Sequence, residues 1–171
     1  IADNRRVRKS LKMDDTRYIW DELNDTLLQE ADGEGDTIAE YSHEPTQFGP
    51  LISQNRSGHT AFCHYDVPGS MRALTDETGG VTDTYAYDAW GNSLAQSGTT
   101  SNPFRWLGQL GYYFDDRLDA IYVRARVYKP TTGRWMSQDP LFYPIAHADD
   151  RQPYAYVGNR PLKDTDPSGL Q

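Results

Sequence analysis

The sequence has a single cysteine, Cys63, so no disulfide can form within the chain. It also lacks any apolar run approaching the length of roughly 20 residues that a membrane-spanning helix needs. Only 37% of its 171 residues are hydrophobic, yet the aromatic share of 12% is too high for a chain that is disordered throughout. No signal-peptide pattern is present, and the chain begins at Ile1 rather than Met, so we expect a piece of a longer protein.

Positive charge is also scarce. Seventeen Lys and Arg against twenty-five Asp and Glu give a net charge of −8, which disfavours nucleic-acid binding. The exception is a group of six cations near the start of the chain, which we interpret as a solvated strand edge where charge blocks unwanted pairing. They are Arg5, Arg6, Arg8, Lys9, Lys12 and Arg17.

An aromatic-like residue followed by an acid recurs along the chain at nearly constant spacing, with a period of about 22 residues. The four pairs are Trp20-Asp21, His43-Glu44, Tyr65-Asp66 and Tyr87-Asp88. A unit of that length fits two short strands and two turns. Period-2 positions such as Tyr85 and Tyr87 predict one aromatic face and one polar face. We therefore expect an all-β fold, a ladder of antiparallel hairpins in which each unit buries its face against its neighbours.

A helix over residues 21–31 is the alternative for one segment, because Leu23, Leu27 and Leu28 have helical spacing. The weak helix formers Asn24 and Asp25 lie in its middle, and we favour a hairpin turn there. Elsewhere 14 glycines and 10 prolines interrupt the chain too often for long helices.

Several motifs resemble the YD-repeat, or Rhs, family. Residues 87–92, Tyr-Asp-Ala-Trp-Gly-Asn, are similar to its repeat signature, and residues 104–109, 122–128 and 133–140 are similar to its C-terminal core. The pattern departs at Lys129, where the family usually has Asp, and over residues 141–152. The resemblance implies YD-repeat hairpins over 1–100 and a core domain over 101–171. It also implies that the hairpins form part of a spiral β-sheet shell and that the core curls inward as a plug.

The tail Asp166-Pro167-Ser168-Gly169-Leu170 is similar to the motif at which Rhs toxins and ABC-toxin C subunits cut themselves. The resemblance implies an aspartyl protease acting in cis, with cleavage at or just after Leu170, before Gln171. Two carboxylates can supply the base and the acid that peptide hydrolysis needs. We expect Asp139 and Asp166 to form the pair. We expect Arg134 to orient a carboxylate or the scissile carbonyl, and Trp135 and Leu170 to fill the pocket.

The same Asp-Pro pairs also occur as ordinary turn openers, so a structural role stays open. Three other acids are alternative partners, namely Asp149, Asp150 and Asp164. A metal site at His59, Cys63 and His64 is disfavoured, because neighbouring strand residues point to opposite faces. Residues 32–36 alternate acids as calcium loops do, but they lack the sixth-position glycine and fit a turn better. We expect no metal and no cofactor.

Two functions remain open. The first is a toxin-encapsulating module that cuts itself once and whose partners are the rest of the shell and an enclosed C-terminal toxin; by resemblance it would be secreted or delivered by a bacterial secretion system. The second is a non-catalytic structural or adhesive module that binds a protein or a glycan. In either case we expect a sheet edge near residues 3–12 that favours self-association.

Overall fold

The computed structural model describes residues 5–11, 14–140 and 152–170. Its first part is a nine-stranded antiparallel sheet in simple sequential order, here called the wall. The strands of the wall are β1 (Arg8–Leu11), β2 (Asp14–Asp21), β3 (Thr26–Ala31), β4 (Thr37–His43), β5 (Leu51–Arg56), β6 (His59–Tyr65), β7 (Met71–Thr75), β8 (Val81–Tyr87) and β9 (Ser93–Ser97).

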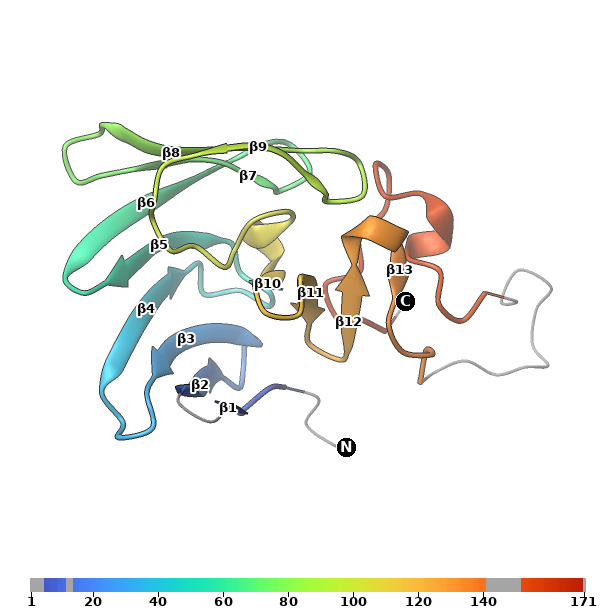
Figure 1. The fold of residues 1–171 in the computed structure, drawn as a ribbon, viewed down its shortest axis with the longest axis horizontal. Coiled ribbons are helices and arrows are strands. Elements are labelled where there is room, and N and C mark those ends of the chain that lie inside the picture. The colour runs from blue at the N-terminus through green and yellow to red at the C-terminus, as the bar shows by residue number, and fades with distance from the viewer. Residues whose placement is uncertain (1–4, 12–13, 141–151, 171) are drawn as a thin grey trace.

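Residues 101–140 and 152–170 are here called the plug. It contains a small antiparallel sheet and three short 3₁₀ helices and lies against the concave side of the wall (Figure 1). Its elements are η1 (Gly108–Leu110), β10 (Tyr113–Asp115), β11 (Ala120–Val123), β12 (Arg126–Lys129), η2 (Pro130–Thr132), β13 (Arg134–Trp135) and η4 (Val157–Asn159). The predicted all-β, antiparallel fold is confirmed. No helix in the part of the chain that the structure describes is long and apolar enough to cross a membrane.

In three of the four repeated pairs, Asp21, Asp66 and Asp88, the acid closes a turn with its carboxylate. The Asp88 Oδ1 accepts hydrogen bonds from the backbone N–H groups of Trp90 (2.8 Å) and Asn92 (2.9 Å). Asp66 accepts one from Ser70 in the same way. At the opposite end of the hairpins, Asp76 accepts from Thr78 and Gly80. Asp favours turns because its carboxylate can accept such bonds from nearby backbone N–H groups. The spacing of the acids in the sequence therefore sets the spacing of the turns.

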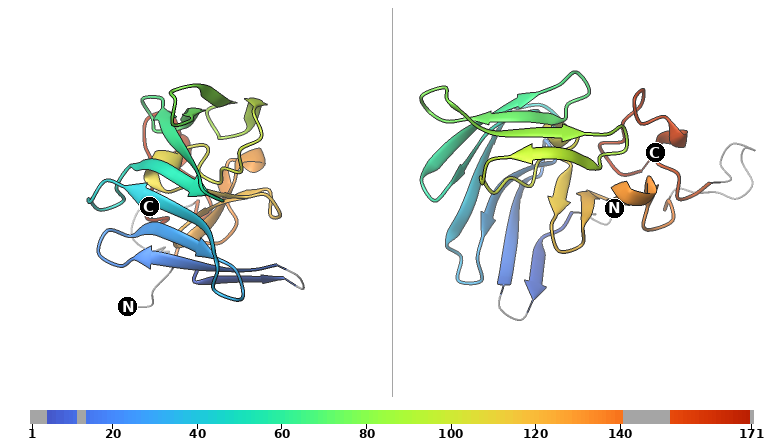
Figure 2. Two further views of the ribbon diagram at one scale, coloured as in Figure 1. Left: turned by 90° about the vertical axis from the view of Figure 1, so that its left-hand side faces the viewer. Right: turned by 45° about the horizontal axis from the view of Figure 1, so that its top comes forward.

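The aromatic member of each pair lies at a β-bulge. The pairing register shifts immediately before Trp20, His43, Tyr65 and Tyr87. A bulge adds a residue to one strand, bends it and increases its twist. A bulge in every repeat unit therefore explains why the wall curves instead of lying flat, as the two views of Figure 2 show.

The concave face of the wall carries its buried aromatic side chains. Tyr41 packs edge-on against Phe104 of the plug, with ring centroids 5.0 Å apart, and Tyr18 packs edge-on against Tyr113 at 5.7 Å. Tyr85 and Tyr87 stack on one face, as their period-2 spacing predicts. Burial of these rings drives the wall onto the plug.

A buried carboxylate joins the edge of the wall to the plug. Arg6 Nη1 and Lys9 Nζ lie 2.9 and 2.7 Å from the carboxylate of Asp115 in β10. β1 is an edge strand and Arg8 is exposed on it, paired with Asp15. The prediction of solvated cations is therefore wrong for Arg6 and Lys9, because a buried acid distant in sequence draws them in. Lys12 of this group and Asp3, the first residue of the predicted sheet edge, lie outside the described residues.

The segment for which a helix was the alternative forms a hairpin. β2 and β3 pair across a turn at residues 22–25, in which Asp25 has a φ of 58°. The Asp21 carboxylate closes this turn by accepting bonds from the backbone N–H groups of Leu23 and Asn24. The weak helix formers thus serve as turn residues, as predicted.

Candidate functional site

The two acids chosen from the sequence lie on one guanidinium group. Arg126, in β12, places Nη1 2.9 Å from Oδ2 of Asp139 and Nη2 3.1 Å from Oδ2 of Asp166. The exposed fractions of the three side chains are 1%, 16% and 0% in that order. The fold thus brings together two carboxylates that are far apart in the sequence, and it supplies the positive charge that offsets their repulsion.

Asp166 organises the chain around Leu170. Its Oδ1 accepts hydrogen bonds from Ser168 Oγ, Gly169 N and Leu170 N at 2.9, 2.9 and 3.1 Å. Its backbone is held by Tyr112, whose hydroxyl donates to Asp166 O and accepts from Asp166 N. Asp166 therefore fixes residues 166–170 as a compact turn within the plug.

Gly169 lets that turn approach the hairpin between β11 and β12. It has a φ of +71°, and a Cβ at this position would lie 2.3 Å from Val123 O. Arg126 Nε donates to Gly169 O. The carbonyl preceding Leu170 is thus held by the same guanidinium that holds the two acids.

Asp139 follows β13 and is the more accessible of the pair. Its backbone N–H donates to Pro153 O at 3.1 Å, which fixes the chain after the Gly-Arg-Trp motif. Trp135, predicted to fill the pocket, is 2% exposed. Its ring lies under the Arg126 guanidinium, 4.2 Å from the guanidinium carbon to the ring centroid. This stacking holds Arg126 in the orientation that both carboxylates use.

Arg134, predicted to orient a carboxylate, points elsewhere. It is exposed, and its Nη1 donates to Gln152 Oε1 at 3.4 Å. The arginine that contacts both carboxylates is Arg126. The sequence does carry one signal for Arg126. It lies two residues before Tyr128, so both occupy the buried face of β12, and a cation on a buried face needs an acidic partner.

Arg124 is a second arginine that sequence analysis missed. It is 5% exposed, and it donates to Asp25 O in the wall, to Leu110 O in the plug and to Pro167 O in the tail. The ring of Phe48, in the turn between β4 and β5, lies 4.3 Å from its guanidinium carbon. Burial lowers the pKa of Arg124. This side chain connects two turns of the wall to the tail motif.

Chemically, the site combines groups of the kinds that peptide hydrolysis uses. A carboxylate reached by solvent can accept a proton from water, and a guanidinium can stabilise negative charge that develops on a carbonyl oxygen. The buried carboxylate and the turn that it closes hold the adjoining chain in place. Gln171, Asp149 and Asp150 lie outside the described residues. Asp164, the remaining alternative, pairs instead with Arg160 Nε at 2.9 Å.

The other candidates are ordinary parts of the wall. Cys63 packs inside, and burial raises its pKa to about 11, whereas His64 is exposed and contacts Thr75. No group of three His, Cys, Asp or Glu side chains in the described ranges has metal-site geometry. In residues 32–36, Asp32 Oδ1 accepts three backbone N–H bonds of its own turn, so the turn prediction is confirmed.

Comparison with known proteins agrees with this architecture. The Teneurin YD-shell family model matches residues 45–162. The tRNA nuclease WapA of Bacillus subtilis is 31% identical over 167 residues, covering 96% of this chain. The toxin protein Tse5 of Pseudomonas aeruginosa is 34% identical over 132 residues, covering 77%. The chain spans only 7% and 9% of the lengths of these two relatives.

Solved structures share the fold. The Photorhabdus luminescens Tc holotoxin pore matches 99% of this chain with a TM-score of 0.70 and 18% identity, and TcdB2-TccC3-TEV matches 98% with a TM-score of 0.69 and 17% identity. In each case the matched part is 8% of the solved chain. The repeated hairpins, the curved wall and the matched family model lead to one conclusion: the chain belongs to the YD-repeat (Rhs) family and is part of a YD shell.

Proposed function

We propose that the chain is the C-terminal part of a toxin-encapsulating YD shell and that it cuts itself once, after Leu170. Asp139 and Asp166 carry the reaction together with Arg126. The single observation that supports this most strongly is the shared guanidinium, which holds both acids and the carbonyl of Gly169.

In the proposed reaction, Asp139 takes a proton from a water molecule, because it is the more accessible acid of the pair. The water oxygen attacks the carbonyl carbon of Leu170, and positive charge from Arg126 stabilises the developing oxyanion. The bond to the nitrogen of Gln171 then breaks, and that nitrogen receives the proton. Asp166 holds the N–H of Leu170 throughout, so the bond stays in position.

The shell part of the proposal follows from the curved wall and from relatives that include toxins. A wound sheet pairs most of its strand edges and encloses what lies inside. The partners are then the remaining shell and a polypeptide that follows Gln171. Export, or delivery by a bacterial secretion system, belongs to the same proposal.

One observation favours the non-catalytic alternative. Asp166 is fully buried and accepts bonds from three groups of its own turn besides Arg126. A carboxylate engaged in this way also serves to hold the tail in place without any reaction. The two functions differ in whether the chain beyond Leu170 is released.

The test uses the full parent chain, including the sequence after Gln171. Intact mass should show a cut after Leu170 in the wild type. Asp139→Asn and Asp166→Asn should each lower the cleaved fraction at least 100-fold. Asp164→Asn is the matched control, since Asp164 lies in the same tail but pairs with Arg160, and it should cut normally. If the full wild-type chain folds but is not cut, self-cleavage is refuted and the non-catalytic function remains.

A further inference from the structure

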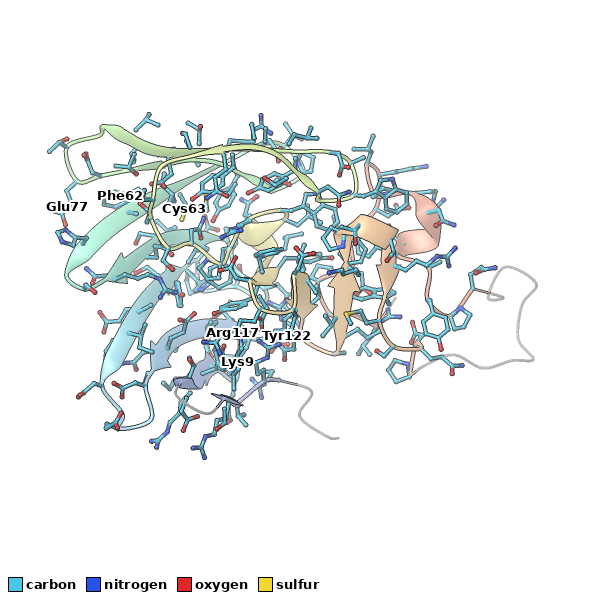
Figure 3. The ribbon with its side chains drawn as sticks, viewed as in Figure 1. Lys9, Phe62, Cys63, Glu77, Arg117 and Tyr122 are labelled. Atoms are coloured by element: carbon cyan, nitrogen blue, oxygen red, sulfur yellow. The ribbon has the colours of Figure 1, made fainter. Side chains whose placement is uncertain are left out.

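Five aromatic rings belong to one buried cluster in the plug, and three of them carry a hydroxyl group. None of the five residues is more than 5% exposed; they are Trp106, Tyr112, Tyr128, Trp135 and Tyr156. Figure 3 shows how closely side chains fill the space between the wall and the plug. A hydroxyl group in such surroundings needs a hydrogen-bond partner, because its removal from water otherwise costs free energy. The partners of the three hydroxyls therefore indicate their roles.

The Tyr112 hydroxyl uses its full capacity for hydrogen bonds. It donates to Asp166 O at 2.9 Å and accepts from Asp166 N at 3.1 Å. Its third partner is the hydroxyl of Tyr156, at 2.9 Å. A tyrosine hydroxyl has one proton to donate. Because Tyr112 gives this proton to Asp166 O, Tyr156 is the donor in the bond between the two hydroxyls.

Tyr156 belongs to the segment that holds Asp139. Pro153 O accepts a hydrogen bond from the backbone N–H of Asp139 at 3.1 Å. Only two residues separate Pro153 from Tyr156, and one of them, Ala155, forms a bridge to β13. The bond between the two hydroxyls therefore links the backbone at Asp139 to the backbone at Asp166.

This tyrosine link differs in charge from the link through Arg126. The contacts of Arg126 are ionic, and protonation of Asp139 in the proposed reaction weakens one of them. The tyrosine link is neutral. Burial raises the pKa of the Tyr112 and Tyr156 hydroxyls, so both keep their protons. The tyrosine link can therefore hold the two acids in place while their charges change.

We propose that Tyr112 and Tyr156 are positioning residues for self-cleavage and that the bond between their hydroxyls fixes the spacing of Asp139 and Asp166. This assignment rests on the proposed self-cleaving function. The two tyrosines act through the backbone of the acids rather than on the bond that is cut. A displacement of about 1 Å can cost about 100-fold in rate, so loss of the tyrosine link should slow the cut.

The test follows the cut over time by intact mass, in the full parent chain made by cell-free synthesis. Tyr156→Phe keeps the ring and the bonds between Tyr112 and Asp166, but it removes the link, and it should slow the cut at least 10-fold. Tyr112→Phe should slow the cut at least as much. The double variant should be no slower than Tyr112→Phe, because both residues act in one link. Independent, multiplied effects would contradict a shared link.

Tyr128→Phe is the matched control. Tyr128 lies in the same cluster, but its hydroxyl donates to Trp90 O in the wall at 2.9 Å. The control variant thus loses a buried hydrogen bond that involves neither acid's segment, and its rate should stay within twofold of the wild type. Rates are compared at a temperature at which circular dichroism shows every variant folded. Equal slowing in all three single variants would overturn the proposal, because the hydroxyls would then contribute only stability.

The pH dependence of the rate separates positioning from a general loss of stability. Two nearby carboxylates titrate as a pair, and their apparent pKa values depend on their separation. Tyr112→Phe and Tyr156→Phe should therefore shift the profile of rate against pH by about half a unit or more. Tyr128→Phe should keep the wild-type profile. Unshifted profiles in the first two variants would contradict the positioning role.

The positioning role and self-cleavage itself fail in different ways. A wild-type chain that folds but is not cut refutes self-cleavage, and with it the positioning role. If the wild-type chain is cut, and Tyr112→Phe and Tyr156→Phe are cut at the same rate, only the positioning role is refuted.

Discussion

The wall and the plug are held together in different ways. In the wall, each strand pairs with its neighbour in sequence, and the turns are closed by carboxylates within a few residues. In the plug, buried arginines join segments that are 14 to 99 residues apart. Local interactions leave a repeating signal in the sequence, whereas long-range ones leave only an isolated charge at a buried position.

The largest expected effect is in the plug. Arg126→Met should cost about 3–5 kcal/mol of unfolding free energy, because it leaves two acids without their shared cation. Arg134→Met is the control on the neighbouring strand, where the exposed side chain contacts Gln152, and it should cost less than about 0.5 kcal/mol. Urea unfolding measures both. Equal losses would show that Arg126 does not hold the plug together.

The next largest effect is expected at Gly169, compared with Gly35. Both glycines have a positive φ, but only Gly169 is closely surrounded by other atoms. Gly169→Ala should cost about 3 kcal/mol, because its Cβ would meet Val123 O in addition to the backbone strain. Gly35, in a wall turn, has a φ of +101° and nothing within 4 Å of an added Cβ. Gly35→Ala should therefore cost about 1 kcal/mol. Similar melting temperatures for the two variants would contradict the packing of the tail.

Asp115 tests the junction of the two regions. Burial by itself raises its pKa, but hydrogen bonds from Lys9 and Arg6 outweigh burial and hold the pKa below its usual value. The stabilisation is therefore complete above the unfolded-state pKa of about 3.9 and is lost as the pH falls through the lower folded-state value. Asp115→Asn should cost about 2 kcal/mol at pH 7.

The difference between Asp115→Asn and the wild type should shrink as the pH falls from 5 toward 2, as measured by urea unfolding at each pH. A constant difference would mean that the ion pairs contribute nothing and that only packing is lost.

The smallest effect is expected on the outer face of the wall. Phe62→Thr should change stability by no more than about 0.5 kcal/mol, because the side chain is 39% exposed and Thr also favours strands. Phe104→Ala, at a ring that is 1% exposed between wall and plug, is the contrast and should cost about 3–5 kcal/mol. A large loss at Phe62 would indicate a covered outer face.

This contrast also explains what the sequence could predict. The spacing of Tyr65-Asp66 and Tyr87-Asp88 predicts the hairpins correctly, because the acid acts on its own turn. Asp139 and Asp166 could be chosen from their motifs. Their contact through Arg126 could not, because nothing near Arg126 in the sequence identifies acids so far along the chain as its partners. The prediction that Arg6 is solvated was wrong for the same reason, because its partner Asp115 lies far along the chain in β10.

The position of Arg124 has a consequence for the order of assembly. The carbonyl groups of Asp25 and Leu110, to which it donates, precede it in the chain, whereas that of Pro167 comes 43 residues later. Chains emerge from the ribosome starting at the N-terminus. The groups that receive the tail are therefore synthesised before the tail itself, and Arg124 can bind Asp25 O and Leu110 O before Pro167 has emerged.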